Sequence, residues 1–230
     1  MNLKNKIYLN ITAGEMDGQV YRWEDKLKEV NTMGLKEVCV FPEYLELKER
    51  KKMYPELLKS CIKKVPLVHI RDDMEKWELK FFYDNFKTRW FNFHEHSFDD
   101  LLRGEWRGFH KHLLLEFNYN NRISKLVDLK KIGGLCIDLS HLWSAKNRNV
   151  TEFDRCNEAA KNHKVKCNHL NGYDAKDMHD LHYVSNNSEL DYLKEIPKKF
   201  FGKIIALEMY NTIEEQLKFK KYIVKIMKNN

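Results

Sequence analysis

The sequence predicts an α/β protein that folds as a single (β/α)8 TIM barrel over residues 1–230. Short β-rich runs recur along the whole chain, and a longer segment with helical periodicity follows each of them. This alternation is the pattern of parallel strands joined by crossover helices. No linker, low-complexity tract or charge block divides the chain, and barrels of this length commonly form one domain.

Eight strands are expected, each short and rich in aliphatic, aromatic or β-branched residues. In chain order they are KIYLNIT (6–12), EVCVFP (37–42), PLVHIR (66–71), WFNFHEH (90–96), HLLLEFN (112–118), GLCIDLS (134–140), VKCNHLN (165–171) and KIIALEM (203–209). Eight strand–helix units without spare segments account for one closed barrel.

Several of the intervening helices have recognisable ends. The helix after the first strand stops at Gly34, which is a good C-cap residue. The last helix opens with Thr212 and Glu215, which form a capping box. Another helix is expected to begin at Ser188 and to end before Pro197, because proline cannot continue it.

The composition predicts a soluble, cytoplasmic protein. Hydrophobic residues make up 43% and charged residues 33% of the chain, and no stretch has the length of a membrane span or the pattern of a signal peptide. The five cysteines show no CxxC spacing and are expected to be reduced thiols in the core. The net charge of +7 favours an anionic partner such as nucleic acid or a phosphorylated metabolite. No protein partner is predicted.

Polar side chains mark the C-terminal ends of six of the eight strands, which is where barrel enzymes gather their catalytic groups. These residues are His69, His94, Glu116, Asp138 with His141, His169 and Glu208. The first two strands carry no such residue. Carboxylates crowded at one rim would repel each other unless a cation joined them. Imidazoles mixed with carboxylates are the ligand set of zinc, manganese or iron, so the rim is expected to bind metal.

The long connection 171–188 adds two donors to the same rim, Asp180 and His182. Two choices stay open from the sequence. His96 competes with His94 as the ligand from the fourth strand, and His179 competes with His182; His94 and His182 are preferred on motif fit. His110, His112 and His163 are expected to be structural or surface residues.

These motifs together resemble the endonuclease IV family within the xylose-isomerase-like TIM barrels, and the resemblance covers almost the whole chain. The segments that carry it are LNITAGE, LVHIR, FNFHEHS, LLLEFN, CIDLSH, NHLN, DLH and ALEM. Their combination and order are specific, although each motif alone is not.

The resemblance implies a cluster of up to three zinc ions, with manganese or another divalent metal as an alternative. In the implied arrangement the first ion is held by His69 and His94, Glu116 bridges it to a second held by Asp138, His169 and Glu208, and the third is held by His141, Asp180 and His182. All nine positions carry a compatible residue.

The implied activity is hydrolysis of a DNA phosphodiester, with abasic sites as the expected target. Clustered divalent ions supply hydroxide near neutral pH and neutralise the phosphate, and Glu116 or Glu208 is expected to orient the water. Candidates for phosphate contacts among the basic rim residues are Arg71, Arg122, Lys146 and Arg148.

Two other functions fit parts of the pattern. A sugar or sugar-phosphate isomerase or epimerase of the same superfamily would need a single divalent ion at Glu116, Asp138, His169 and Glu208, and its partner would be a small sugar. A noncatalytic metal-binding barrel is the third alternative. The connection in HIRDDMEKW is shorter than the loops with which the endonuclease IV family bends DNA, and DLH lacks that family's intervening arginine.

Overall fold

The protein is a nearly closed parallel α/β barrel, in which the N-terminal strands lie between the first and last parts of the sheet. The computed structural model describes residues 6–16, 18–94, 106–117 and 129–228. Its main sheet has the order β1-β13-β10-β9-β8-β7-β6-β5-β2, and all its pairings are parallel. Only Leu9 separates β1 from β2, and this one stretch of chain pairs with β13 on one side and with β5 on the other.

Each of the eight predicted strand ranges contains a strand of this sheet. The strands are β1 (Ile7–Tyr8), β2 (Asn10–Thr12), β5 (Cys39–Phe41), β6 (Leu67–His69), β7 (Trp90–His94), β8 (Leu113–Phe117), β9 (Gly134–Asp138), β10 (Val165–Leu170) and β13 (Ile204–Leu207). The sixth expected strand is two residues too long, because a helix begins at Leu139. Residues 95 and 96 of the fourth lie outside the described residues.

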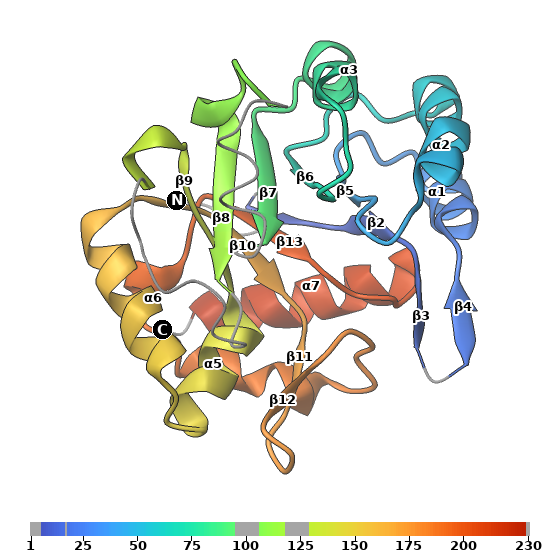
Figure 1. Ribbon diagram of the computed structural model, residues 1–230. Helices are drawn as coiled ribbons and strands as arrows, with labels where there is room; N and C mark the ends of the chain where they lie inside the picture. Colours follow the sequence, from blue (N-terminus) through green and yellow to red (C-terminus); the bar gives the residue numbers. More distant parts are fainter. Residues whose placement is uncertain (1–5, 17, 95–105, 118–128, 229–230) are drawn as a thin grey trace.

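Helices lie around the barrel (Figure 1). They are α1 (Trp23–Thr32), α2 (Leu47–Lys59), α3 (Lys76–Phe86), α5 (Leu139–Asn147), α6 (Thr151–Asn162) and α7 (Ile213–Lys228). Gly34 has φ 65°, which confirms the glycine stop after α1. The capping box of α7 is also confirmed, since Thr212 N donates to Glu215 Oε2 at 2.9 Å and Glu215 N donates to Thr212 Oγ1 at 3.2 Å. None of the described helices is both long and apolar enough to cross a membrane.

The connection after β10 departs from the strand–helix alternation. It forms a hairpin, β11 (Gly172–Asp174) with β12 (His179–Leu181), followed by the 3₁₀ segment η5 (Asn187–Lys194) where the sequence predicted an α-helix. A second hairpin, β3 (Gly14–Met16) with β4 (Gln19–Tyr21), follows β2. Both hairpins lie on the side of the barrel toward which β7 and β8 point (Figure 1).

Alternation along the strands separates two cores. Outward-facing side chains such as Ile11, Val68 and Phe91 pack with the helices in the larger core. Inward-facing side chains fill the barrel with Cys39, Phe41, Leu67, Leu114, Cys136, Cys167 and Ala206. The two-residue repeat of the strands therefore sets which side chains reach the mouth of the barrel. All five cysteines are free thiols; four of them are buried as predicted, whereas Cys61 is only half-buried.

A buried ion pair joins α2 to α3. Arg50 Nε donates to Glu78 Oε2 at 2.7 Å, both side chains are fully buried, and Tyr54 also donates to this carboxylate. Removing one partner of such a pair leaves an uncompensated charge inside the protein.

We expect Arg50→Met to lower the free energy of unfolding by about 3–5 kcal/mol, measured by urea denaturation. The matched control is Lys52→Met on the same helix, which removes an exposed pair with Glu49 and should cost less than about 1 kcal/mol. Equal decreases in the free energy of unfolding of the two variants would show that the buried ion pair stabilises the fold no more than the exposed one.

Candidate metal centre

Polar groups form a layer directly above the apolar filling of the barrel. Each of five strands places a polar residue two positions after a residue that fills the barrel. The pairs are Leu67 and His69, Leu114 and Glu116, Cys136 and Asp138, Cys167 and His169, and Ala206 and Glu208. All five polar residues are at most 6% exposed. The alternation of a strand thus turns side chains that are far apart in sequence toward one another.

The first donor group contains His69, His94 and Glu116, whose ligand atoms lie within 4.8 Å of one another. His69 Nε2 is 3.1 Å from Glu116 Oε2, and His94 Nε2 is 4.0 Å from the same oxygen. Asn92 Nδ2 donates to this oxygen at 2.7 Å. His94, the residue preferred from the sequence, thus lies with this group. Its competitor His96 lies outside the described residues, so the choice between them stays a prediction.

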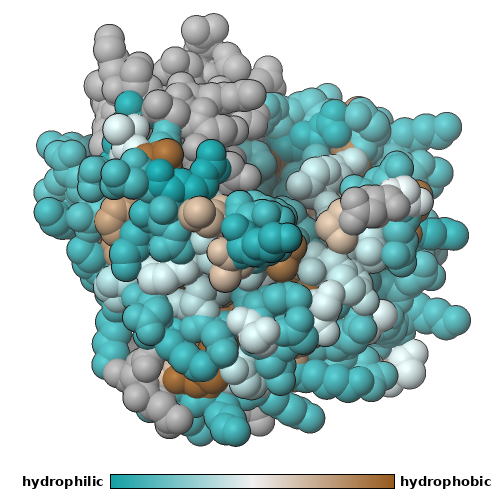
Figure 2. Space-filling view, turned by 90° about the horizontal axis from the view of Figure 1, so that it is seen from below, coloured by the Kyte–Doolittle hydropathy of each residue, from teal (hydrophilic) through white to brown (hydrophobic). Residues whose placement is uncertain are grey.

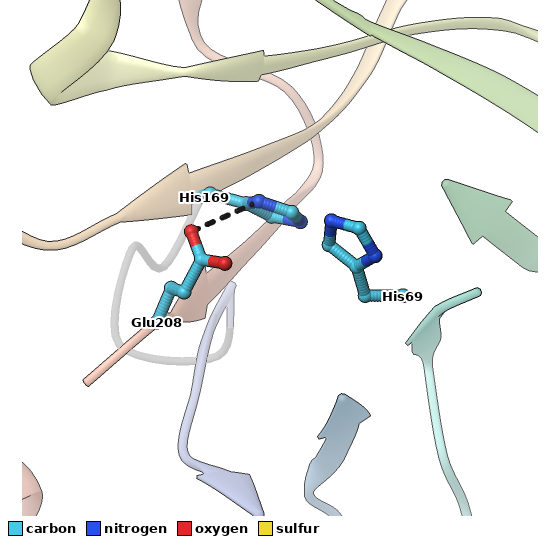
Figure 3. Close-up of side chains that lie close together, drawn as sticks. All are labelled: His69, His169 and Glu208. Atoms are coloured by element: carbon cyan, nitrogen blue, oxygen red, sulfur yellow. Dashed lines mark ion pairs between the residues drawn. The ribbon is translucent and has the colours of Figure 1, made fainter. Parts of the chain in front are cut away.

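The second donor group contains Glu116, Asp138, His169 and Glu208, all buried. His169 Nδ1 lies 3.1 Å from Glu116 Oε1 and 3.1 Å from Glu208 Oε2. Figure 3 shows His69 and His169 reaching toward each other from opposite sides, with the Glu208 carboxylate beside His169. Because Glu116 turns Oε2 to the first group and Oε1 to the second, its carboxylate lies between them.

The third donor group contains His141, Asp180 and His182 and is more open to solvent. Asp180 Oδ1 lies 3.3 Å from His141 Nε2, and Asp180 Oδ2 lies 3.1 Å from His182 Nε2. His179 instead lies on the outer side of the hairpin with two exposed or half-buried aspartates. Of the two candidates in this loop, His182 is thus the one beside His141.

Asp138 explains why a carboxylate and an imidazole stand three residues apart at the end of β9. Asp138 is the N-cap of α5, and its Oδ1 accepts hydrogen bonds from His141 N and Ser140 Oγ, both at 2.8 Å. Its Oδ2 accepts a bond from Asn171 at 3.3 Å. The cap fixes the first turn of the helix, so that His141 is held at the mouth of the barrel.

The ring nitrogens of His69 and His169 lie close to carboxylates but not in good hydrogen-bond geometry. All four nitrogens are buried, and none makes a well-aligned hydrogen bond with a described residue. Carboxylate oxygens nevertheless lie 2.7–3.1 Å from three of them. Buried polar atoms are normally hydrogen bonded, whereas donors bound to one zinc ion at 2.0–2.2 Å lie about 3 Å apart. The spacing fits donors that share a cation.

The charges of the site also favour a cation. Burial opposes the charged form of His69, but the Glu43 and Glu116 carboxylates outweigh it and raise its pKa to about 10. The pKa of His169 is raised in the same way, against burial, by the neighbouring Cys136, Glu116 and Glu208. Without another cation, protons on these imidazoles would balance the carboxylates. A metal ion can replace those protons, so binding should release protons and weaken at low pH.

The third group shows the same balance. Burial lowers the pKa of His141, but Asp138 and Asp180 raise it to about 10. The pKa of His182 is raised to about 9, again against burial, chiefly by Asp180. Burial raises the pKa of Asp180, yet the two histidines hold it well below the ordinary range. Asp180 is therefore a carboxylate between two nitrogen donors.

Glu43 is a polar rim residue that sequence reasoning missed, and the expectation that the second strand carries no such residue is wrong. Its Oε2 lies 2.7 Å from His69 Nδ1, on the side of the ring away from Glu116. Glu43 stands two positions after the inward-facing Phe41, so the same alternation could have found it. Pro42 hid the signal, because it appeared to end the strand.

The basic residues predicted to contact phosphate have different contacts in the structure. Arg71 is engaged with Glu46 at 2.7 Å and with Asp73 at 3.1 Å. Lys146 lies over the ring of Trp143, 4.3 Å from its centroid, and Arg148 is the C-cap of α5. Arg122 lies outside the described residues. The roles of these residues in phosphate binding stay predictions.

Comparison with known proteins places the chain in no family. No family model matches it, and neither does any curated protein.

Proposed function

We propose that the chain is a (β/α)8 barrel of the xylose-isomerase-like kind and a zinc-dependent phosphodiester hydrolase of the endonuclease IV type, acting on DNA. The observation that carries the proposal is the placement of Glu116. Its two oxygens face different donor groups, with Oε2 3.1 Å from His69 Nε2 and Oε1 3.1 Å from His169 Nδ1. A carboxylate in this position can bridge two ions. The separate third group supports three ions rather than one.

The chemistry of the donors suits hydrolysis of a phosphodiester. When bound, clustered divalent ions supply hydroxide near neutral pH and offset the charge of the phosphate. Burial raises the pKa of Glu116, but His169 and His69 together hold it well below the ordinary value. The pKa of Glu208 is raised, mainly by burial. Glu116 is thus suited to remain a bridging carboxylate, and Glu208 is suited to accept a proton from the attacking water.

The charge and surface of the molecule support an anionic polymer as substrate. The chain carries a net charge of +7, which attracts a phosphate backbone and makes its binding dependent on salt. Figure 2 looks onto the face at which β7 and β8 end, and its coloured surface is mainly hydrophilic, with only scattered apolar patches. Such a surface suits a polar substrate better than an apolar one.

The proposal is tested by incubating the protein with a DNA duplex that contains one abasic site. We expect cleavage at that site, loss of cleavage with a chelator, and recovery when zinc is added back. His169→Ala should be inactive, while His163→Ala, at the C-cap of α6, should cleave normally. A metal-loaded protein that cleaves neither abasic nor intact DNA would contradict the proposal.

A sugar isomerase with one divalent ion is the second candidate. It is favoured by the second donor group taken alone, because Glu116 and Glu208 both lie 3.1 Å from the same nitrogen of His169. Two carboxylates on either side of one ion can move a proton at a substrate carbon. Interconversion of aldose and ketose by protein loaded with about one manganese ion per chain, together with no DNA cleavage, would favour this candidate.

A further inference from the structure

A second concave site adjoins the metal centre at the mouth of the barrel. It is a pocket of about 580 Å³ between the β3–β4 hairpin and the connection from β5 to α2. The residues that matter for its chemistry are Gly14, Glu15, Tyr21, Arg22, Tyr44 and Glu49. Its volume falls in the range of small-molecule sites.

Stacked tyrosines hold the side of the pocket nearest the metal centre. The rings of Tyr21 and Tyr210 are stacked, with centroids 4.7 Å apart and planes 12° apart. The hydroxyl end of Tyr210 also lies against Gly14, where an added Cβ atom would come within 2.8 Å of two ring carbons and closer still to the hydroxyl. A side chain at position 14 would therefore displace the Tyr210 ring. The hairpin and Tyr210 therefore hold each other in place.

Tyr44 supplies the open aromatic face of the pocket. Its ring centroid lies 6.4 Å from that of Tyr210, and the residue is 51% exposed. A large exposed aromatic beside a fixed aromatic stack is a suitable platform for a planar ligand, because stacking on tyrosine is favourable for any base.

Residues of the pocket are adjacent to residues of the metal centre. Tyr44 directly follows Glu43, which lies 2.7 Å from His69. Tyr210 stands two positions after Glu208, and its ring lies 5.8 Å from that of His182. A ligand whose ring occupied the pocket would therefore have its next chemical group close to the metal ligands.

The charges in the pocket oppose binding of a phosphate there. Glu15, Glu24 and Glu49 line it, and Arg22 is the one cation among its described lining residues. Arg22 lies 3.4 Å from Glu24, and Glu49 pairs with Lys52 at 2.6 Å. Glu15 forms no ion pair with any described residue and is exposed. This carboxylate can accept hydrogen bonds from amino groups, as acidic side chains do from cytosine.

We propose that this pocket binds a nucleobase with an exocyclic amino group, stacked on Tyr44, while the adjoining phosphate lies at the metal centre. The inference rests on the proposed function and names the part of the substrate next to the cleaved bond. Tyr44 and Glu15 are binding residues here, and the metal ligands take no part in holding the base.

The test measures equilibrium binding of single nucleosides to the whole protein in the presence of a chelator. Binding is detected by calorimetry or by ligand-observed NMR. Deoxycytidine should bind, and Tyr44→Ala should weaken it by about 5- to 150-fold, which corresponds to the usual 1–3 kcal/mol of one stacked base. Tyr44→Phe should bind as the parent does. Trp77→Ala, which removes an exposed aromatic from α3, is the matched control and should have no effect.

A second variant tests the polar half of the proposal. Glu15→Gln should reduce the preference for deoxycytidine over thymidine and leave the thermal midpoint unchanged, because the side chain is exposed. Equal binding of deoxycytidine by the parent and Tyr44→Ala would overturn the proposal. So would the absence of nucleoside binding, or binding of free deoxyribose as tight as that of the nucleoside.

The two proposals fail separately. Nucleoside binding in the presence of a chelator needs no metal. If the protein binds deoxycytidine through Tyr44 but cleaves no DNA, the pocket proposal stands and the hydrolase proposal fails. If it cleaves abasic DNA but binds no nucleoside, the hydrolase proposal stands and the pocket proposal fails.

Discussion

Glu116→Gln is expected to lower metal-dependent DNA cleavage by at least about a thousandfold, since metal ions contribute several kcal/mol to such reactions. The amide keeps the shape of the side chain but offers one neutral oxygen and an NH₂ group instead of two negatively charged oxygens. Because Glu116 faces both His69 and His169, two ions should be weakened together. Cleavage rates at saturating zinc, with the metal content of the same sample, measure the effect.

The matched control is Glu56→Gln, which removes an exposed carboxylate paired with Lys59 on α2. It should retain normal cleavage and metal content. Glu116→Gln should still fold, because the residue lies above the apolar filling of the barrel and does not form part of it. If the cleavage rate of Glu116→Gln were within tenfold of the parent's rate, Glu116 would not be needed for the reaction.

Glu43→Gln is expected to weaken the binding of one ion by about 10- to 100-fold, which is the usual effect of losing the carboxylate behind a metal-binding histidine. Glu43 contacts Nδ1 of His69 and leaves Nε2 directed at Glu116. Its charge should fix the ring and raise its basicity. Zinc titration against a competing chelator, read as separate binding steps, measures the change.

Glu46→Gln is the matched control for Glu43→Gln. Glu46 lies three residues further along the same connection, is paired with Arg71 and has a side chain 71% exposed. It should bind zinc as the parent does. If Glu43→Gln left every binding step unchanged, Glu43 would be a packing residue and His69 would not depend on it.

The positions of the strand ligands could be predicted from the sequence because a strand alternates its faces. Once Leu67 and Ala206 point into the barrel, His69 and Glu208 must point to its mouth. Curvature of the sheet into a nearly closed barrel then brings these separate strands together. The same rule should have identified Glu43, which follows Phe41 by the same two residues.

Other features depend on contacts that no local pattern encodes. His94 and His96 have the same parity along the strand, so alternation cannot separate them. The approach of Asp180 to His141 depends on the β11–β12 hairpin, which is tied to α5 by Ser144 Oγ donating to Met178 O at 2.5 Å. Neither hairpin was predicted, because each is formed by strands of only three residues, too short for a periodicity to be recognised.

The segment after the second hairpin shows the limit of helical periodicity as a guide. The sequence predicts a helix that begins at Ser188 and ends before Pro197; the segment does end there, but the backbone forms η5 as a 3₁₀ helix. Asn186 caps its first turn through Ser188 N, and Tyr192 is anchored to Asn171 O at 3.0 Å. These tertiary contacts favour the tighter helix over the α-helix that propensity alone would choose.

The metal content of the purified chain tests the central claim most directly. After saturation with zinc and removal of loosely bound ions, elemental analysis should find about three ions per chain, one for each donor group. The count should fall in Glu116→Gln and remain unchanged in Glu46→Gln. A value near one ion per chain would contradict the three-ion hydrolase, and no bound zinc would contradict the metal centre itself.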